Sequence, residues 1–66
     1  MTNLDSYKHS VDVLCGRYFN DTEEGAIDLD ELLAYAKYDH LFNSVKGYVE
    51  VKYPDVYEAH FAWEDE

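Results

Sequence analysis

The features that mark secreted and membrane proteins are scarce in this chain. It has a single cysteine, Cys15, so it forms no internal disulfide, and this fits a reducing compartment. It contains no apolar run of the roughly 20 residues that a membrane-spanning helix needs. No apolar stretch follows basic residues near its start, as it does in a secretory signal. We therefore expect a cytoplasmic protein.

The residues that carry most catalytic and metal-binding chemistry stand at scattered positions. His9, Cys15, His40 and His60 have none of the short paired spacings that are typical of zinc ligands. There is no Ser-His-Asp or Cys-His order and no glycine-rich phosphate loop. A chain of 66 residues also has little room for a substrate pocket of roughly 300 Å³ or more. We expect no enzymatic activity, no bound metal and no cofactor.

Basic residues are scarce as well. Five Lys and Arg stand against fifteen Asp and Glu, which gives a formal net charge of -10. Phosphate backbones and anionic lipids repel such a surface, so we expect no direct nucleic-acid binding and no membrane binding. Apolar residues make up 47% of the chain, which argues against disorder. The chain is expected to form one acidic domain over residues 1–66, whose marginal core is compatible with a homodimer.

Hydrophobic periodicity predicts helices in the first part of the chain. Apolar residues recur there at three- and four-residue steps, which indicates an amphipathic helix over about residues 4–19. A polar loop over 20–28 is expected next. Asp28, followed three residues later by Glu31, then has the pattern of a capping box and predicts a second helix from Leu29 to about Lys37. A short third helix would end near Gly47.

The sequence changes character from Tyr48 onwards, where Val, Tyr and Phe are frequent and alternate with other residues. This pattern predicts two strands joined by a turn at Pro54 and Asp55. The positions on their apolar faces are Val49, Val51 and Tyr53, and then Tyr57, Ala59, Phe61 and Trp63. Two strands alone are unstable, so helices must cover the apolar face. The predicted fold class is therefore α+β, with N-terminal helices packed on a C-terminal antiparallel β-hairpin or small sheet.

The stretch N-D-T-E-E-G-A-I-D-L-D-E, residues 20–31, resembles an EF-hand calcium loop. Gly25 stands at the place of the sharp turn, and Glu31 at the place of the bidentate closing ligand. The three early ligand places hold Asn20, Thr22 and Glu24, where Asp is usual in the first place and Asp or Asn in the others. No second loop is present to pair with this one. A degenerate calcium-binding module is one alternative function.

The acids have a second interpretation that uses more of the chain. Carboxylates on neighbouring turns of a helix lie about 5–6 Å apart, which approaches the spacing of phosphates along one DNA strand. A rigid surface with such a pattern would bind the positively charged site of a DNA-binding protein. The acids expected to bind this partner are Asp21, Glu23, Glu24, Asp28, Asp30 and Glu31, and then Asp39, Glu50, Asp55 and Glu58.

A set of short aromatic motifs points in the same direction. They comprise Tyr35, Tyr38-Asp39, Phe42, Gly47-Tyr48 and Val56-Tyr57-Glu58-Ala59-His60-Phe61, with Arg17-Tyr18-Phe19 before them. In these motifs the chain resembles the C-terminal domain of ArdA-type antirestriction proteins. The resemblance implies a DNA mimic that occupies the DNA groove of a restriction-modification complex. ArdA proteins are longer, multi-domain dimers. A stand-alone acidic module of this size is also similar to the small anti-CRISPR proteins of phages and mobile elements, some of which keep a Cascade-type complex from reading DNA.

Together these observations predict an inhibitor of a bacterial DNA-targeting defence complex that acts in the cytoplasm of the host cell. Its partner would be the DNA-binding subunit of a CRISPR effector in the first place, or of a restriction enzyme in the second. Besides the calcium-binding module, the other alternative is a non-enzymatic protein-interaction module that docks through exposed tyrosines.

Overall fold

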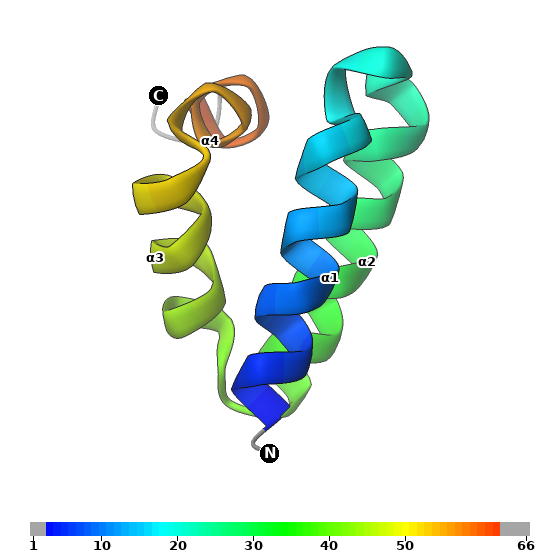
Figure 1. Cartoon of the computed structure of the whole chain (residues 1–66). Coiled ribbons are helices and arrows are strands. Elements are labelled where there is room, and N and C mark those ends of the chain that lie inside the picture. Colours follow the sequence, from blue (N-terminus) through cyan, green and yellow to red (C-terminus); the bar gives the residue numbers. More distant parts are fainter. Residues whose placement is uncertain (1–2, 63–66) are drawn as a thin grey trace.

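The computed structural model describes residues 3–62, and this part of the chain folds into helices without any strand. The elements are α1 (Asn3–Arg17), the short 3-10 helix η1 (Tyr18–Asn20), α2 (Thr22–Tyr38), α3 (Phe42–Lys52) and α4 (Pro54–Phe61). Helices α1 and α2 form an antiparallel hairpin, α3 packs beside both of them, and α4 crosses near the end of the hairpin where α1 finishes (Figure 1). The predicted α+β fold is wrong, because the described residues form an all-α fold.

The first predicted helix is confirmed over most of its length. It was expected over residues 4–19, and α1 occupies Asn3–Arg17 before the chain tightens into η1. Among the apolar side chains of residues 4–19, Val11, Cys15 and Tyr18 are buried. Phe19 is 58% exposed, because the 3-10 turn carries it away from the core face.

Helix α2 begins at Thr22, well before the expected start at Leu29. Asp21 is its N-cap, and its carboxylate accepts a hydrogen bond of 3.2 Å from the Glu24 N–H. Asp21 and Glu24 therefore provide the capping signal that the sequence analysis placed at Asp28 and Glu31. Residues 22–28 were predicted to be a loop partly because of Gly25. A Cβ atom at Gly25 would lie 3.1 Å from the Tyr18 carbonyl oxygen, so this glycine permits close packing of η1 on α2.

The predicted β-hairpin is helical within the described residues. Val45 and Val49 are buried one turn apart on α3, and Val56 and His60 are buried one turn apart on α4. The residues whose alternation predicted strands are therefore also spaced as in a helix. Val51, which was expected on the apolar face of a strand, is 83% exposed. Trp63 of the predicted second strand lies outside the described residues.

Pro54 of the predicted turn and Gly47, the predicted end of the third helix, both lie in helices. Pro54 is at the start of α4, where its missing N–H leaves no hydrogen bond unmade. Helix α3 continues through Gly47, which was expected to end a helix, as far as Lys52. Glycine in a helix interior weakens the helix without ending it.

The connection between α2 and α3 is a Schellman motif. His40 N–H donates to the Lys37 carbonyl at 3.1 Å, and Leu41 N–H donates to the Ala36 carbonyl at 2.7 Å. His40 has a φ of 62°, in the left-handed region where glycine is the usual residue. The helix therefore ends cleanly after Tyr38, and α3 turns back along the hairpin.

The core lies where α1, α2, α3 and α4 meet. Its largest fully buried side chains are Val11, Leu29, Val45 and Val49. Phe61 closes it from α4 and is 3% exposed. Each of these helices therefore contributes to one core.

Candidate functional site

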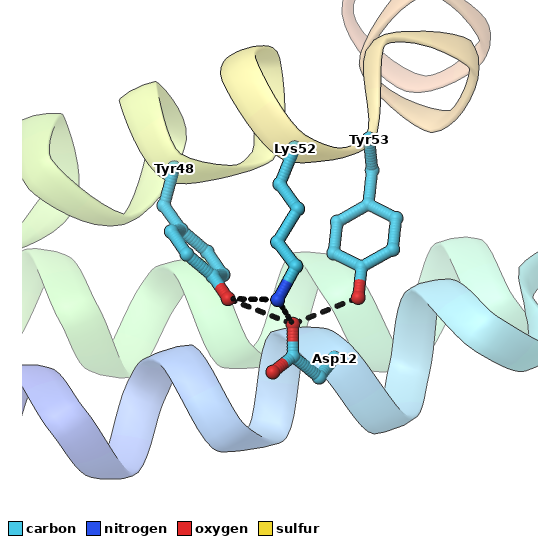
Figure 2. Close-up of polar contacts among 4 residues, drawn as sticks. All are labelled: Asp12, Tyr48, Lys52 and Tyr53. Carbon is cyan, nitrogen blue, oxygen red and sulfur yellow. Dashed lines mark hydrogen bonds and ion pairs between the residues drawn. The ribbon is translucent and has the colours of Figure 1, made fainter.

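The first polar feature of the structure is a cluster centred on Asp12, in the middle of α1. Its Oδ1 accepts a hydrogen bond of 2.8 Å from the hydroxyl of Tyr48 and another of 2.8 Å from the hydroxyl of Tyr53. Lys52 Nζ lies 3.2 Å from the same oxygen and donates to the Tyr48 hydroxyl at 2.9 Å. We call these four residues the Asp12 cluster; its side chains converge from the end of α3 onto α1 (Figure 2).

The contacts within the Asp12 cluster favour the ionised form of the Asp12 carboxyl group. The hydroxyl of Tyr53, and after it that of Tyr48, lower the pKa of Asp12 by donating to the carboxylate. The same carboxylate raises the pKa of Tyr53. The hydroxyl of Tyr48 and the carboxylate of Asp12 raise the pKa of Lys52. The hydrogen bonds and the ion pair of the Asp12 cluster thus join α1 to the end of α3, and this role is structural.

The second polar feature is the buried imidazole of His60. Its Nδ1 is 3.3 Å from the Tyr18 hydroxyl, and its Nε2 is 2.7 Å from Asp30 Oδ1. A neutral imidazole that carries its proton on Nε2 satisfies both contacts, since it accepts from Tyr18 and donates to Asp30. His60 therefore ties α4 to both η1 and α2.

A groove runs along the α1–α2 hairpin. Its main part has a volume of about 370 Å³, and a smaller continuation of about 190 Å³ lies toward η1. The main part is lined by His9, Ser10, Val13, Leu14, Asp28, Glu31, Leu32 and Tyr35. The continuation is lined by Leu14, Arg17, Asn20, Asp21, Glu24, Gly25 and Asp28. We call the two parts together the α1–α2 groove. None of its lining residues comes from α3 or α4, so it lies on the outer side of the hairpin.

Four of the acids predicted to bind a partner lie along this groove. Asp21, Glu24, Asp28 and Glu31 line it from the α2 side, and we call them the carboxylate row. Asp28 is half-buried and the other three are exposed. Their spacing of three or four residues places them on successive turns of one helix face. The structure therefore brings together four of the ten acids that were expected to bind a partner.

The remaining six acids are divided among other places. Asp30 contacts His60, and Asp39 accepts a hydrogen bond from the Tyr7 hydroxyl. Glu23 is in the first turn of α2 and Asp55 in the first turn of α4, where the positive end of the helix dipole favours a carboxylate. Glu50 is exposed on α3 and Glu58 is exposed on α4. None of these six lines the α1–α2 groove.

The EF-hand resemblance over residues 20–31 does not correspond to a loop in the structure. Thr22 to Glu31 belong to the continuous helix α2, whereas an EF-hand needs a loop that wraps its ligands around the ion. Within residues 3–62, no group of three or more His, Cys, Asp or Glu side chains is placed to hold a metal ion. The acids of this stretch diverge along a helix, which is the geometric reason that they do not converge on one ion.

The sequence did not predict the Asp12 cluster, the contacts of His60 or the apolar side chains that line the α1–α2 groove. Asp12 pairs with residues 36 and 41 positions away, and no local pattern predicts such a contact. Val13 and Tyr35 gave no signal as groove residues because they meet only when α1 and α2 pack side by side. A weak signal did exist for the carboxylate row, since Glu24, Asp28 and Glu31 have helical spacing.

Within the described residues, no helix combines the length and the apolar character that crossing a membrane requires.

Comparisons with protein families, with characterised proteins and with solved structures give no match to this chain. The resemblance to ArdA proteins and to small anti-CRISPR proteins therefore stays a prediction.

Proposed function

We propose that the protein binds a positively charged, nucleic-acid-binding surface of a partner through the carboxylate row and thereby keeps nucleic acid off that surface. The carrying observation is the alignment of Asp21, Glu24, Asp28 and Glu31 along one face of α2, beside a single guanidinium, that of Arg17. The resemblance to ArdA and anti-CRISPR proteins suggests two partners. The first is the DNA-binding subunit of a CRISPR effector, and the second is the DNA-binding subunit of a restriction enzyme.

The charge density of the row supports mimicry of one phosphate strand. From Asp21 to Glu31 the helix axis advances by about 15 Å, at about 1.5 Å per residue, so the row carries one charge per about 5 Å. One strand of B-DNA carries one charge per about 3.4 Å, and the duplex one per about 1.7 Å. The row is therefore closer to a single strand than to a duplex. A net charge of -10 adds a long-range attraction to any basic partner.

The test is a competition experiment with a purified Cascade-type CRISPR complex and a labelled target DNA, followed by fluorescence anisotropy. We expect the protein to lower the fraction of bound DNA, and the inhibition to weaken as salt rises because screening acts on exposed charges. The variant E24K/D28K/E31K changes the net charge from -10 to -4, since each substitution adds two charges. It should weaken inhibition by about tenfold or more.

A matched control separates the row from overall charge. The variant E23K/E50K/E58K has the same net charge of -4 but leaves the carboxylate row intact. It should inhibit within about threefold of the unchanged protein, if local pairing outweighs long-range steering. Equal losses in the two variants would contradict a role for the row. Undiminished DNA binding by both a Cascade-type complex and a restriction enzyme would contradict the proposed targets.

A specific observation also favours the protein-interaction alternative. Tyr35 is 60% exposed and Tyr38 is 83% exposed, and both lie on α2. Exposed tyrosines are enriched where proteins bind one another. Binding that is insensitive to salt, with a partner that does not bind DNA, would favour this alternative over the carboxylate row.

A further inference from the structure

Apolar side chains line the α1–α2 groove beside the carboxylate row, and we call Val13, Leu14, Leu32 and Tyr35 its apolar lining. Val13 is 46% exposed and Tyr35 is 60% exposed, and they lie in the groove with the half-buried Leu14 and Leu32. Apolar surface in a groove with a polar rim is typical of a site that another molecule covers.

The rim of the groove restricts the charge of that molecule. The Asp, Glu, Arg and His side chains that line it are the four acids of the carboxylate row, together with Arg17 and His9. Four carboxylates against one guanidinium make the rim negative, so it favours a cationic occupant. A second copy of this chain would bring a total charge of -10 against another -10. The same electrostatics therefore disfavours a homodimer through this face.

The shape of the groove restricts the occupant further. It follows the hairpin from Tyr35 to Asp21, with the carboxylate row on the α2 side and the apolar lining contributed by both helices. Fourteen residues of helix span about 21 Å, which is the length of about four helical turns. An amphipathic helix presents apolar anchors at such spacing and lays its apolar face into a groove of this kind.

We propose that the α1–α2 groove binds an amphipathic helix of a partner protein, which points apolar side chains at Val13, Leu14, Leu32 and Tyr35 and Lys or Arg side chains at the carboxylate row. This inference rests on the proposed function, because it uses the same row. It adds that the partner is recognised through a basic helix, and that part of the affinity comes from the apolar lining and resists salt.

The test uses a synthetic 14-residue helical peptide of Leu and Lys, with the leucines on one helical face. Two control peptides are a shuffled sequence of the same composition, with leucines spread around the helix, and oligolysine of the same charge. Titration calorimetry should show one saturable site for the amphipathic peptide, with an affinity about tenfold or more above both controls in about 0.15 M salt. Equal binding of the three peptides would overturn the inference.

Two paired variants of the protein locate the site. V13S/Y35S removes apolar surface from the groove, whereas I27S/Y38S removes it from residues that are even more exposed and do not line the groove. The first should weaken peptide binding about tenfold or more, and the second less than about twofold. Circular dichroism verifies that both variants remain helical. Equal losses in the two variants would place the peptide elsewhere and overturn the inference.

The outcomes for the groove and for the proposed function are distinguishable. If V13S/Y35S keeps full peptide affinity while E24K/D28K/E31K abolishes inhibition of DNA loading, the groove inference fails and the proposed function stands. If the groove binds the peptide but neither defence complex is inhibited, the proposed function fails alone. Sedimentation of the protein by itself tests the second copy: a dimer that V13S/Y35S dissociates would contradict a foreign helix as the occupant.

Discussion

The hydroxyl of Tyr53 donates a hydrogen bond of 2.8 Å to Asp12 Oδ1, and this contact joins residues 41 positions apart in the chain. Tyr53 is the residue between α3 and α4, and Asp12 lies in the middle of α1. The position at which the last two helices join is thereby fixed on the first helix. The contact also makes the stability of the fold dependent on the charge of one carboxylate.

Removing that charge should destabilise the protein at neutral pH. The hydroxyls of Tyr53 and Tyr48 lower the pKa of Asp12 below its ordinary value of 3.8. A lowered pKa in the folded state gives stability that is present above 3.8 and is lost as the pH falls through the folded-state pKa. Asp12→Asn should therefore lower the melting temperature at pH 7, and the difference from the unchanged protein should disappear in strong acid.

The matched control for this prediction is Glu50→Gln, which removes one charge from an exposed position of α3. Thermal unfolding followed by circular dichroism between pH 2 and pH 8 measures both variants. A melting temperature that Asp12→Asn changes no more than Glu50→Gln does would show that the cluster contributes nothing to stability.

The contact between Tyr18 and His60 should be worth more than the contact between His60 and Asp30. Tyr18 is 4% exposed and His60 is 5% exposed, so Tyr18→Phe leaves the imidazole Nδ1 without its donor inside the protein. We expect a loss of about 1–3 kcal/mol in the free energy of unfolding. The side chain of Asp30 is 72% exposed, and Asp30→Asn should cost less than about 1 kcal/mol. Urea unfolding measures both; the opposite ranking would contradict the assignment of His60 as a buried tie.

Two glycines in helices should respond to alanine with opposite signs. At Gly47 a Cβ atom would meet nothing within 4 Å, so Gly47→Ala should stabilise the protein by about 0.5–1 kcal/mol through helix propensity. At Gly25 the Cβ atom would lie 3.1 Å from the Tyr18 backbone, so Gly25→Ala should destabilise it by about 1–3 kcal/mol. Denaturant unfolding of both variants is the measurement. Stabilisation by Gly25→Ala would mean that η1 and α2 pack less closely than described.

Cys15 should be unreactive as long as the protein is folded. Burial, together with the charge of Asp12, raises the pKa of its thiol to about 11. At pH 8 about one thiol in a thousand is then the reactive thiolate, compared with about a quarter for an exposed cysteine. Reaction with a thiol reagent should accordingly be slow in buffer and fast in denaturant. Labelling of the folded protein at the rate of an unfolded control would contradict the burial of Cys15.

The first helix was predictable because its apolar residues have an unambiguous period. Tyr7, Val11 and Tyr18 fit a helix and do not fit an alternating strand. The C-terminal half was not predictable in this way. Val49, Tyr53 and Val56 are β-branched or aromatic residues that suit a strand, yet their spacing also suits a helix. Packing against α1 and α2 decides between the two, and that packing has no local signature.

The candidate site was predictable in part. The acids of the carboxylate row were identified individually, but Gly25 and the polar residues around it pointed to a loop over residues 20–28. A loop would have dispersed Glu24 and Asp28, and only the helix that begins at Thr22 aligns them. The apolar lining of the groove could not be predicted from the sequence, because Val13 and Tyr35 belong to different helices whose packing is a property of the whole fold.

The absence of strands from residues 3–62 limits the ways in which a partner can be held. A sheet edge offers a row of unpaired N–H and C=O groups, and many peptides bind by extending such an edge with main-chain hydrogen bonds that are indifferent to sequence. In the helices of residues 3–62 the main-chain groups are already used within each helix, apart from those of the first and last turns. This part of the protein must therefore recognise a partner mainly through side chains. A single substitution in a partner is expected to change the specificity of that interaction.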